Sequence, residues 1–159
     1  AEARDRIREL LGRDDIRSAC ATPGPLMDEV FTPELRGSAQ FSVVDQPAQA
    51  GSALANYDLG ITDCLCLAAH TGSVLVSTAN AGSRAVSLLP PVHLVLARLD
   101  QLVPDIPDAI DLLTSVPGFP DDLPAAYTFI TGSSRTSDIE KVLVVPAHGP
   151  REVFVIILA

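Results

Sequence analysis

Several features that would point to a particular class of protein are scarce or missing from this sequence. There is no tryptophan, aromatic residues make up 4% of the 159 residues, and the formal net charge is −9. Phosphate contacts dominate the affinity of proteins for nucleic acids, and this acidic chain has neither a basic run nor an aromatic-rich segment to make such contacts. The composition therefore argues against nucleic acid as the partner.

Long apolar runs are missing as well. The most apolar segment, residues 85–99, is interrupted by Pro90, Pro91 and His93, whereas a membrane-spanning helix needs roughly 18 apolar residues in succession. Residues 1–5 are charged and contain no apolar stretch typical of a secretory signal. We expect a cytoplasmic protein with no membrane span.

Cysteine and the common catalytic motifs are also rare. The three cysteines, Cys20, Cys64 and Cys66, are too few for a disulfide framework and cannot supply the four thiolates that an iron–sulfur cluster usually needs. No His-x-x-His or Cys-x-x-Cys pair indicates a metal site. The G-x-G-x-x-G, P-loop and G-x-S-x-G motifs are missing, so nothing supports a Rossmann dehydrogenase, a P-loop enzyme or an α/β-hydrolase. We predict no metal and no cofactor in this chain.

What the sequence does contain is typical of a layered α/β domain. Hydrophobic residues make up 47% of the chain and the mean hydropathy is +0.29, which favours strands covered on both faces, as in parallel sheets. We interpret residues 1–159 as a single domain in which 1–58 is poorly defined. The patterns predict helices over 3–11, 105–113 and 138–144, and strands over 41–44, 64–69, 73–78, 86–89, 92–97, 127–130 and 153–158. The last of these strands is expected to be buried, because it is almost entirely apolar.

The stretch TGSSRTSDIEK, residues 131–141, concentrates hydrogen-bonding side chains between a predicted strand and a predicted helix. Such a junction suits an anion, because unpaired backbone N–H groups and the helix dipole both favour negative charge. The predicted anion-binding residues are Gly132, Ser133, Ser134, Arg135, Thr136 and Ser137. A structural alternative is that Ser137 and Glu140 form a capping box. That alternative leaves Ser133, Ser134 and Arg135 unexplained.

A second group of small polar residues, Thr71, Gly72 and Ser73, is either another side of the same pocket or a simple turn between strands. Two histidines, His93 and His148, are the catalytic candidates, because an imidazole could remove a proton from a hydroxyl group. The alternative is that each is a hydrogen-bonded structural residue.

Taken together, five segments resemble the LUD domain family. They are LGITDC (59–64), TGSVLVS (71–77), RAVSLLPPVHLVLARLDQLVPDIPDAIDLL (84–113), TGSSRTSDIEKVL (131–143) and HGPREVFVIIL (148–158). The resemblance implies a three-layer α/β/α sandwich with a mostly parallel sheet, like that of NagB, RpiA and the CoA transferases. The region before Leu59 is shorter than in such proteins. His70 is a departure, since similar proteins often have an acidic residue just before the Thr-Gly pair.

The resemblance also implies a function. It suggests a part in oxidising L-lactate to pyruvate, together with iron–sulfur partner proteins of the LUD type and cysteine-rich partners that hold the clusters. On this reading the chain is a cluster-free, substrate-handling or accessory subunit of a larger complex, not a complete enzyme. Two alternatives stay open: a free-standing enzyme acting on a phosphorylated or CoA-linked small molecule, and a structural assembly protein without a small-molecule site. Fold analogy alone does not decide between them.

Overall fold

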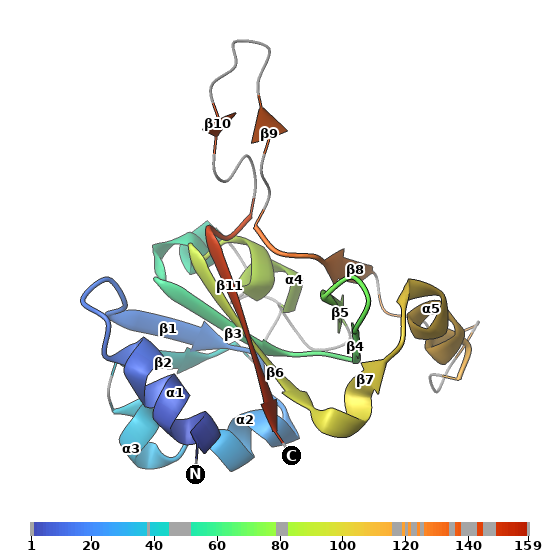
Figure 1. Ribbon diagram of the computed structural model, residues 1–159. Helices are drawn as coiled ribbons and strands as arrows, with labels where there is room; N and C mark the ends of the chain where they lie inside the picture. Colours follow the sequence, from blue (N-terminus) through green and yellow to red (C-terminus); the bar gives the residue numbers. More distant parts are fainter. Residues whose placement is uncertain are drawn as a thin grey trace.

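Two main β-sheets form the body of the protein (Figure 1). The computed structural model describes residues 2–37, 39–44, 52–78, 83–115, 119, 121, 124, 126–133, 136–137, 143–144 and 149–158. The larger sheet has five strands in the order β11-β6-β3-β1-β2, all parallel. Their bounds are β1 Ser18–Ala21, β2 Gln40–Val43, β3 Leu59–Asp63, β6 Val92–Arg98 and β11 Glu152–Leu158.

One face of this sheet is covered by helices α1 (Glu2–Leu11), α2 (Pro25–Val30) and α3 (Pro33–Arg36). The apolar residues of α1 recur at helical spacing, which confirms the helix predicted over 3–11 and buries one side of it. The core on this face contains alternate residues of the strands, because successive side chains of a strand point to opposite faces. Its buried members include Ile7, Leu10, Met27, Phe31, Leu59, Ile61, Leu94 and Leu96.

The opposite face is covered in part by helix α4 (Ser83–Leu88), and the short 3-10 helix η2 (Ser52–Asn56) lies beside it. A Cβ atom added to Gly60 would lie 2.0 Å from the carbonyl oxygen of Val86, so α4 rests directly on the backbone of β3. The strand predicted over 86–89 is therefore wrong. A four-residue apolar run fits a buried helix as well as a strand, and here the helix places Val86 in the core.

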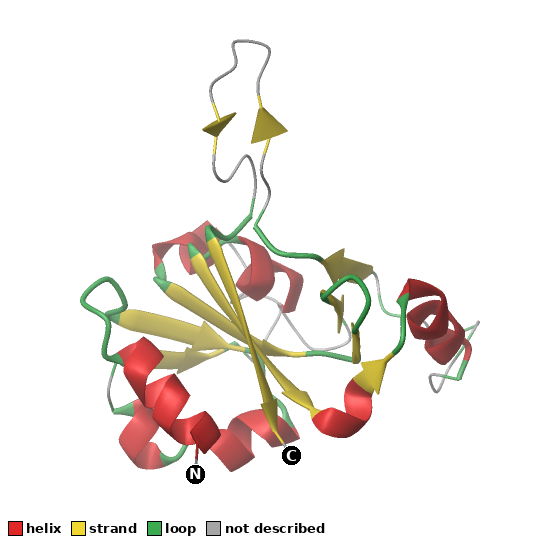
Figure 2. Cartoon of the chain, viewed as in Figure 1, coloured by secondary structure: helices red, strands yellow, loops and turns green. Residues whose placement is uncertain are grey.

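Helices thus lie on both faces of a parallel sheet (Figure 2), which confirms the predicted three-layer α/β class. The region 13–57, where the sequence predicted only the strand at 41–44, also contains β1, α2, α3 and η2. Strand β1 has the sequence SACA, whose small residues carry little β propensity. It is a strand because it lies between β2 and β3 and its buried side chains fill the core.

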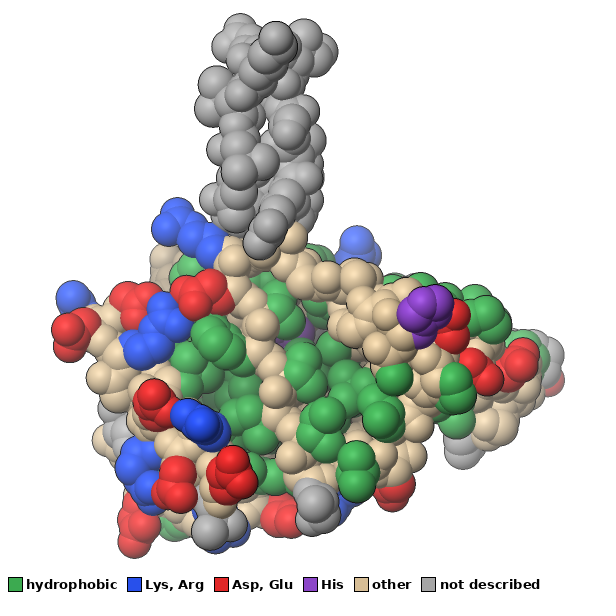
Figure 3. All heavy atoms as spheres, in the orientation of Figure 1, with side chains coloured by type: hydrophobic (Ala, Val, Ile, Leu, Met, Phe, Trp, Pro, Cys, Tyr) green, Lys and Arg blue, Asp and Glu red, His purple; other side chains and the backbone are tan. Residues whose placement is uncertain are grey.

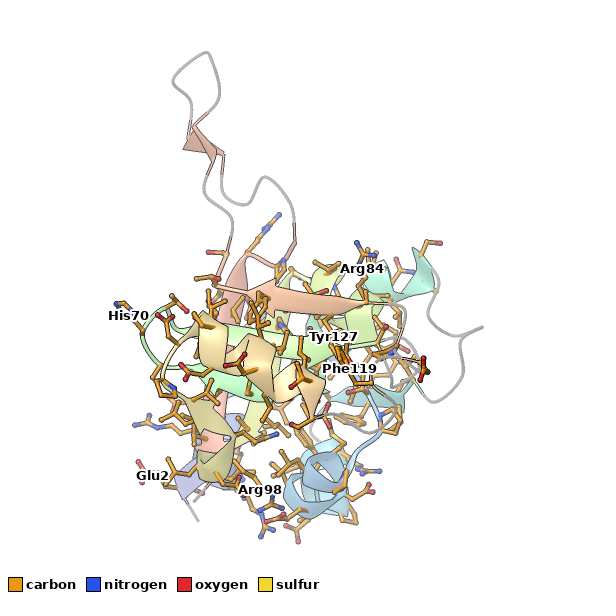
Figure 4. The ribbon with its side chains drawn as sticks, turned by 90° about the vertical axis from the view of Figure 1, so that its right-hand side faces the viewer. Glu2, His70, Arg84, Arg98, Phe119 and Tyr127 are labelled. Carbon is orange, nitrogen blue, oxygen red and sulfur yellow. The ribbon has the colours of Figure 1, made fainter. Side chains whose placement is uncertain are left out.

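The second sheet has four strands in the order β7-β4-β5-β8, with β4 antiparallel to β5 and β5 antiparallel to β8. Its elements are β4 Cys66–Ala68, β5 Ser73–Ser77, the 3-10 helix η3 Leu99–Gln101, β7 Leu102–Val103, α5 Ile106–Thr114 and β8 Tyr127–Ile130. Two separate segments of the chain form this sheet. Strands β4 and β5 follow β3, and β7 and β8 follow β6. Helix α5 covers its outer face near Tyr127 (Figure 4), and this helix and the three predicted strands are confirmed.

The remaining strands, β9 (Thr136–Ser137) and β10 (Leu143–Val144), pair antiparallel and stand clear of both sheets in Figure 1. The helix predicted over 138–144 is wrong at its C-terminal end, since residues 143 and 144 are a strand. Residues 138–142 lie outside the described part of the chain.

The burial predicted for 153–158 is also wrong. This segment is strand β11, at the edge of the sheet, where Val155 and Ile157 are 40% and 45% exposed. Within the described residues, no helix is both long and apolar enough to cross a membrane.

Candidate anion-binding site

The tripeptide Thr-Gly-Ser occurs twice, at 71–73 and at 131–133, and the second sheet brings the two copies together. Strand β5 begins at Ser73 and β8 ends at Ile130. In their antiparallel register Val74 lies opposite Ile130, so the pair of residues just beyond it is Ser73 and Thr131. The prediction that residues 71–73 are a second side of the pocket is consistent with this placement.

Three hydroxyl groups connect the two tripeptides. Thr71 donates a hydrogen bond of 2.8 Å from its Oγ1 to the Oγ of Ser73, and Ser73 Oγ lies 2.8 Å from Thr131 Oγ1. Ser73 is fully buried, whereas Thr71 and Thr131 are exposed. Ser73 and Thr131 each have one hydroxyl proton, and either can be the donor in this pair. When Ser73 donates, the proton of the exposed Thr131 is available to an acceptor outside the protein.

The two glycines leave the backbone open at this end of the sheet. Gly72 has a φ of 66° and Gly132 a φ of 107°, both in the range that favours glycine. Apart from the glycine and its chain neighbours, no heavy atom of the described residues lies within 4 Å of the position that a Cβ would take at Gly72 or Gly132. A ligand can therefore approach the main chain closely beside the exposed hydroxyl of Thr131.

The turn that holds the first tripeptide is tied to the start of α5. The His70 amide donates to the carbonyl oxygen of Pro104, and His70 Nδ1 lies 3.0 Å from Asp105 Oδ2. The hydrogen bond with His70, followed by that from the Ile106 amide, lowers the pKa of Asp105. Figure 4 shows His70 projecting into solvent from the end of the β4–β5 hairpin.

Sequence reasoning missed this contact. Asp105 caps α5 and orients His70, a role that the predicted helix over 105–113 did not assign to it. The available signal was the Asp-x-x-Asp spacing at 105 and 108, which matches the capping box that the structure contains.

For several other predicted site residues the structure describes no side chain. Ser134, Arg135 and His148 lie outside the described residues, and of Thr136 and Ser137 only the backbone, in β9, is described. Ser137 pairs with Leu143 in a two-stranded ribbon, so the helix that it was predicted to cap does not include Leu143 and Val144. The hydrogen-bonded hydroxyls of Thr71, Ser73 and Thr131 are called the hydroxyl chain below. Ser133, which is partly buried, lies two residues after Thr131.

His93 lies elsewhere, inside the larger sheet. Its side chain is fully buried, and its Nε2 is 2.9 Å from the hydroxyl oxygen of Thr62. Burial lowers the pKa of His93 to about 4, so the imidazole is neutral at neutral pH. Nδ1 has no hydrogen-bond partner among the described residues. A ring enclosed in this way suits a structural role better than proton exchange with a substrate from solution.

The cysteines are all free and buried. Burial raises the pKa of the Cys20 and Cys64 thiols to about 12, and it also raises that of Cys66. They are therefore neutral thiols, which behave as small apolar side chains. Within the described residues no three His, Cys, Asp or Glu side chains are grouped in a way that could hold a metal ion.

The fold and this cluster define a layered α/β protein in which a small mixed sheet presents hydroxyl-bearing turns beside a parallel sheet. The LUD domain model matches residues 1–158. The chain belongs to the LUD domain family.

Curated relatives carry a more specific name. The chain is 32% identical over 117 residues to lactate utilization protein C of Deinococcus radiodurans, a match that covers 72% of this chain and 52% of that protein. It is 35% identical over 101 residues to lactate utilization protein C 1 of Bacillus mycoides, covering 63% of this chain and 43% of that one. The chain thus spans about half the length, or less, of these relatives.

A solved structure shows the same fold. The crystal structure of a DUF162 family protein from Deinococcus radiodurans superposes with a TM-score of 0.67 over 100% of this chain and 84% of that one. The sequence identity is 20%, so this likeness concerns the fold.

Proposed function

We propose that this protein takes part in the use of L-lactate, as a substrate-handling or accessory subunit of a complex that oxidises lactate to pyruvate. Its similarity to proteins named lactate utilization protein C supports the pathway. The observation that carries a substrate-handling role is the series of hydrogen-bonded hydroxyls from Thr71 through Ser73 to Thr131, which ends in the exposed hydroxyl of Thr131 beside two open glycine turns.

The chemistry of this cluster matches a 2-hydroxy acid. A carboxylate accepts hydrogen bonds from hydroxyl and backbone N–H groups, and the 2-hydroxyl of lactate can both donate and accept. A hydrogen bond to a charged group contributes about 1.5–3 kcal/mol, so Thr131 and one amide alone would bind lactate only weakly. On a chain of net charge −9 a cation is also needed, and Arg135, two residues after Ser133, is the predicted source.

The oxidation itself requires an electron acceptor. Lactate loses two electrons and two protons when its 2-hydroxyl becomes the ketone of pyruvate. The three cysteines of this chain are buried neutral thiols, which suits a chain that leaves the iron–sulfur clusters to its partners. In this proposal the protein positions lactate, and cluster-bearing partner proteins receive the electrons.

Growth and turnover test the pathway. A strain lacking the gene is complemented with the wild type, Thr131→Val or Thr114→Val, and is grown on L-lactate as the carbon source. Thr114 is the matched control, since its hydroxyl donates to the Asp111 carbonyl near the end of α5. We expect Thr131→Val to lower lactate-dependent dye reduction in extracts about tenfold or more, the effect of one lost charge-assisted hydrogen bond, and Thr114→Val to leave it unchanged. Unimpaired growth of the deletion strain on L-lactate would contradict the pathway.

Arg135 gives a separate test of the charge. Arg135→Ala should abolish lactate-dependent activity of the assembled system while the thermal unfolding temperature stays the same. Full activity in this variant, or a loss that merely follows unfolding, would contradict the role of Arg135.

Binding can be followed directly on the isolated protein. In an NMR titration, L-lactate should shift the amide resonances of Gly72, Ser73, Gly132 and Ser133, with smaller effects from acetate, which has no hydroxyl. If inorganic phosphate or an acyl-CoA shifts these resonances and L-lactate does not, the free-standing enzyme becomes the better explanation.

A further inference from the structure

His70 is an exposed histidine that a carboxylate holds by one ring nitrogen. Its side chain is 78% exposed, and its Nδ1 lies 3.0 Å from Oδ2 of Asp105. Figure 4 shows the side chain projecting from the end of the β4–β5 hairpin. Among the described residues Nε2 has no hydrogen-bond partner, so this nitrogen is open to a ligand.

The contact with Asp105 determines which nitrogen carries the proton. Oδ1 of Asp105 accepts a hydrogen bond of 2.7 Å from the Ile106 amide, and Oδ2 faces His70. These bonds, that with His70 first, lower the pKa of Asp105, so the carboxylate is ionised at neutral pH. An ionised carboxylate can only accept hydrogen bonds, and the proton of the neutral ring is therefore on Nδ1. Nε2 is left with a lone pair that accepts a hydrogen bond.

The main chain keeps this ring beside the hydroxyl chain. His70 directly precedes Thr71, where the hydroxyl chain begins, and successive Cα atoms are about 3.8 Å apart. The Ala69 amide donates to the carbonyl oxygen of Val103 at 2.9 Å, and the His70 amide donates to that of Pro104 at 3.0 Å. The turn is thus fixed by its backbone as well as by the imidazole.

The charges around the ring determine the side from which an anion approaches. Of the described histidines only His70 is exposed, and Figure 3 shows it with acidic side chains on one side and uncharged atoms on the other. Helix α5 contributes Asp105 and the exposed Asp108 and Asp111, which repel a carboxylate. A carboxylate is therefore favoured on the side of the uncharged turn, where the backbone at Gly72 is open.

We infer that His70 recognises the 2-hydroxyl group of a 2-hydroxy acid. Nε2 accepts a hydrogen bond from this hydroxyl, while the carboxylate of the same molecule lies against Thr131 and the open backbone at Gly72 and Gly132. The inference rests on the proposed function and adds to it the group that distinguishes lactate from an acid without a hydroxyl. Asp105 is a positioning residue, which acts on the ligand only by keeping the ring proton on Nδ1.

An NMR titration with two acids of the same carbon skeleton tests the role of His70. L-Lactate has the 2-hydroxyl and propionate lacks it, and the titration is run at about pH 8, where imidazole side chains are mostly neutral. The wild type should bind L-lactate about two- to tenfold more tightly than propionate, as expected for one neutral hydrogen bond. His70→Asn keeps an N–H donor for Asp105 but has no Nε2, so it should bind the two acids equally, with unchanged affinity for propionate.

The outcomes separate this inference from the proposed function. If the wild type binds both acids equally, or if His70→Asn keeps the preference for L-lactate, the role of His70 is overturned although the site still binds lactate. If L-lactate shifts no resonance of the wild type, the proposed function fails and the inference fails with it.

The ring proton gives a second test, which concerns Asp105. Nitrogen-15 spectra of the imidazole should show the proton on Nδ1 in the wild type. Asparagine caps helices about as well as aspartate, and in Asp105→Asn its single oxygen is taken by the Ile106 amide. Its NH₂ group then donates to Nδ1 and moves the ring proton to Nε2. Asp111→Asn removes the same charge from an exposed position of α5 and should leave the proton on Nδ1.

The change of tautomer should alter ligand preference in a defined direction. The ether oxygen of L-2-methoxypropionate can only accept a hydrogen bond, so this acid suits an Nε2–H donor better than a bare Nε2. The preference for L-lactate over this ether should fall in Asp105→Asn and stay at the wild-type level in Asp111→Asn. A wild-type ring protonated on Nε2, or an equal fall in both variants, overturns the inference.

Discussion

The two main sheets of this protein meet along a shared apolar cluster that joins Val95 and Ala97 of β6 to Val74 and Val76 of β5, yet they differ in what they leave open. The five-stranded sheet has helices on both faces, and α4 lies so close to β3 that Gly60 has no space for a methyl group. The four-stranded sheet ends in turns where the backbone at Gly72 and Gly132 faces open space. The first sheet fixes the fold, and the second presents polar groups.

The difference has a physical basis. The parallel strands carry apolar residues on both faces and gain stability from complete burial. The β5–β8 pair is antiparallel, so one strand begins where the other ends and two turn segments of distant sequence lie side by side. Polar groups can gather at this end because water or a ligand satisfies them there.

The largest expected effect is in the five-stranded sheet. Gly60→Ala forces a methyl group against the backbone of α4, and it should lower the free energy of unfolding by about 3 kcal/mol or more, at the upper end for overpacked cores. Gly37→Ala is the control, because Gly37 has a φ of −76° and its nearest neighbours would lie 3.5 Å from the new Cβ. Urea denaturation should show a change of less than about 0.5 kcal/mol for it. Equal effects of the two substitutions would mean that α4 does not rest on β3.

The next largest effect is the contribution of His93 to the free energy of unfolding, which depends on pH. Its pKa in the folded protein is lowered from 6.5 to about 4, so the unfolded chain binds a proton that the folded protein excludes. The stabilisation is complete above about pH 6.5 and is lost as the pH falls toward 4, by up to about 3 kcal/mol. His93→Gln should lack this component, so denaturation midpoints of the two proteins should converge at low pH. Parallel pH profiles would contradict the buried neutral imidazole.

A smaller loss of stability is expected from replacing one buried serine in each region, Ser73 at the four-stranded sheet and Ser87 in α4. Ser73→Ala and Ser87→Ala each remove a buried hydroxyl with a hydrogen bond, and each should cost about 1 kcal/mol of stability. Ser73 belongs to the hydroxyl chain, whereas Ser87 donates to the Arg84 carbonyl within α4. Only Ser73→Ala should weaken lactate binding in the NMR titration. If Ser87→Ala weakens it equally, the four-stranded sheet is not where the ligand binds.

The smallest effect lies at the open turn. Gly72→Ala should cost about 1 kcal/mol, because alanine is strained at a φ of 66° even where space is free. Gly72→Asn should recover part of that loss, since asparagine tolerates the left-handed region better. Thermal unfolding of the three proteins measures both differences. A loss for Gly72→Ala as large as for Gly60→Ala would mean that this turn is packed and not open.

Much of the fold was predictable where local patterns are strong. The helix at α1 has apolar residues at helical spacing, and α5 begins with an aspartate cap and a proline, so both were found. Strands β4, β5, β6 and β8 have runs of apolar and β-branched residues between turns. Strand β1 and helix α4 were missed, because SACA and VSLL are short sequences that suit more than one conformation.

The candidate site was predictable only in part. Both Thr-Gly-Ser tripeptides were recognised as polar turns, but the expected helix after Ser137 is replaced at Leu143–Val144 by a strand of the β9–β10 ribbon. The contact of His70 with Asp105 depends on a separation of 35 residues, which no local pattern encodes.

The sequence by itself determined the layered α/β class, the exposed polar turns and the lack of a thiolate set for a cluster, because these follow from composition and local spacing. Only the tertiary structure decided where segments with similar sequence patterns lie in the fold. Strands β6 and β11 have the same length and a similar apolar content, yet β6 lies between two strands and is buried, while β11 is at the edge of the sheet. The two Thr-Gly-Ser turns, 60 residues apart in the chain, form one hydroxyl chain because β5 and β8 pair in a single register. Burial and strand pairing depend on which distant segments meet, and that is a property of the whole fold.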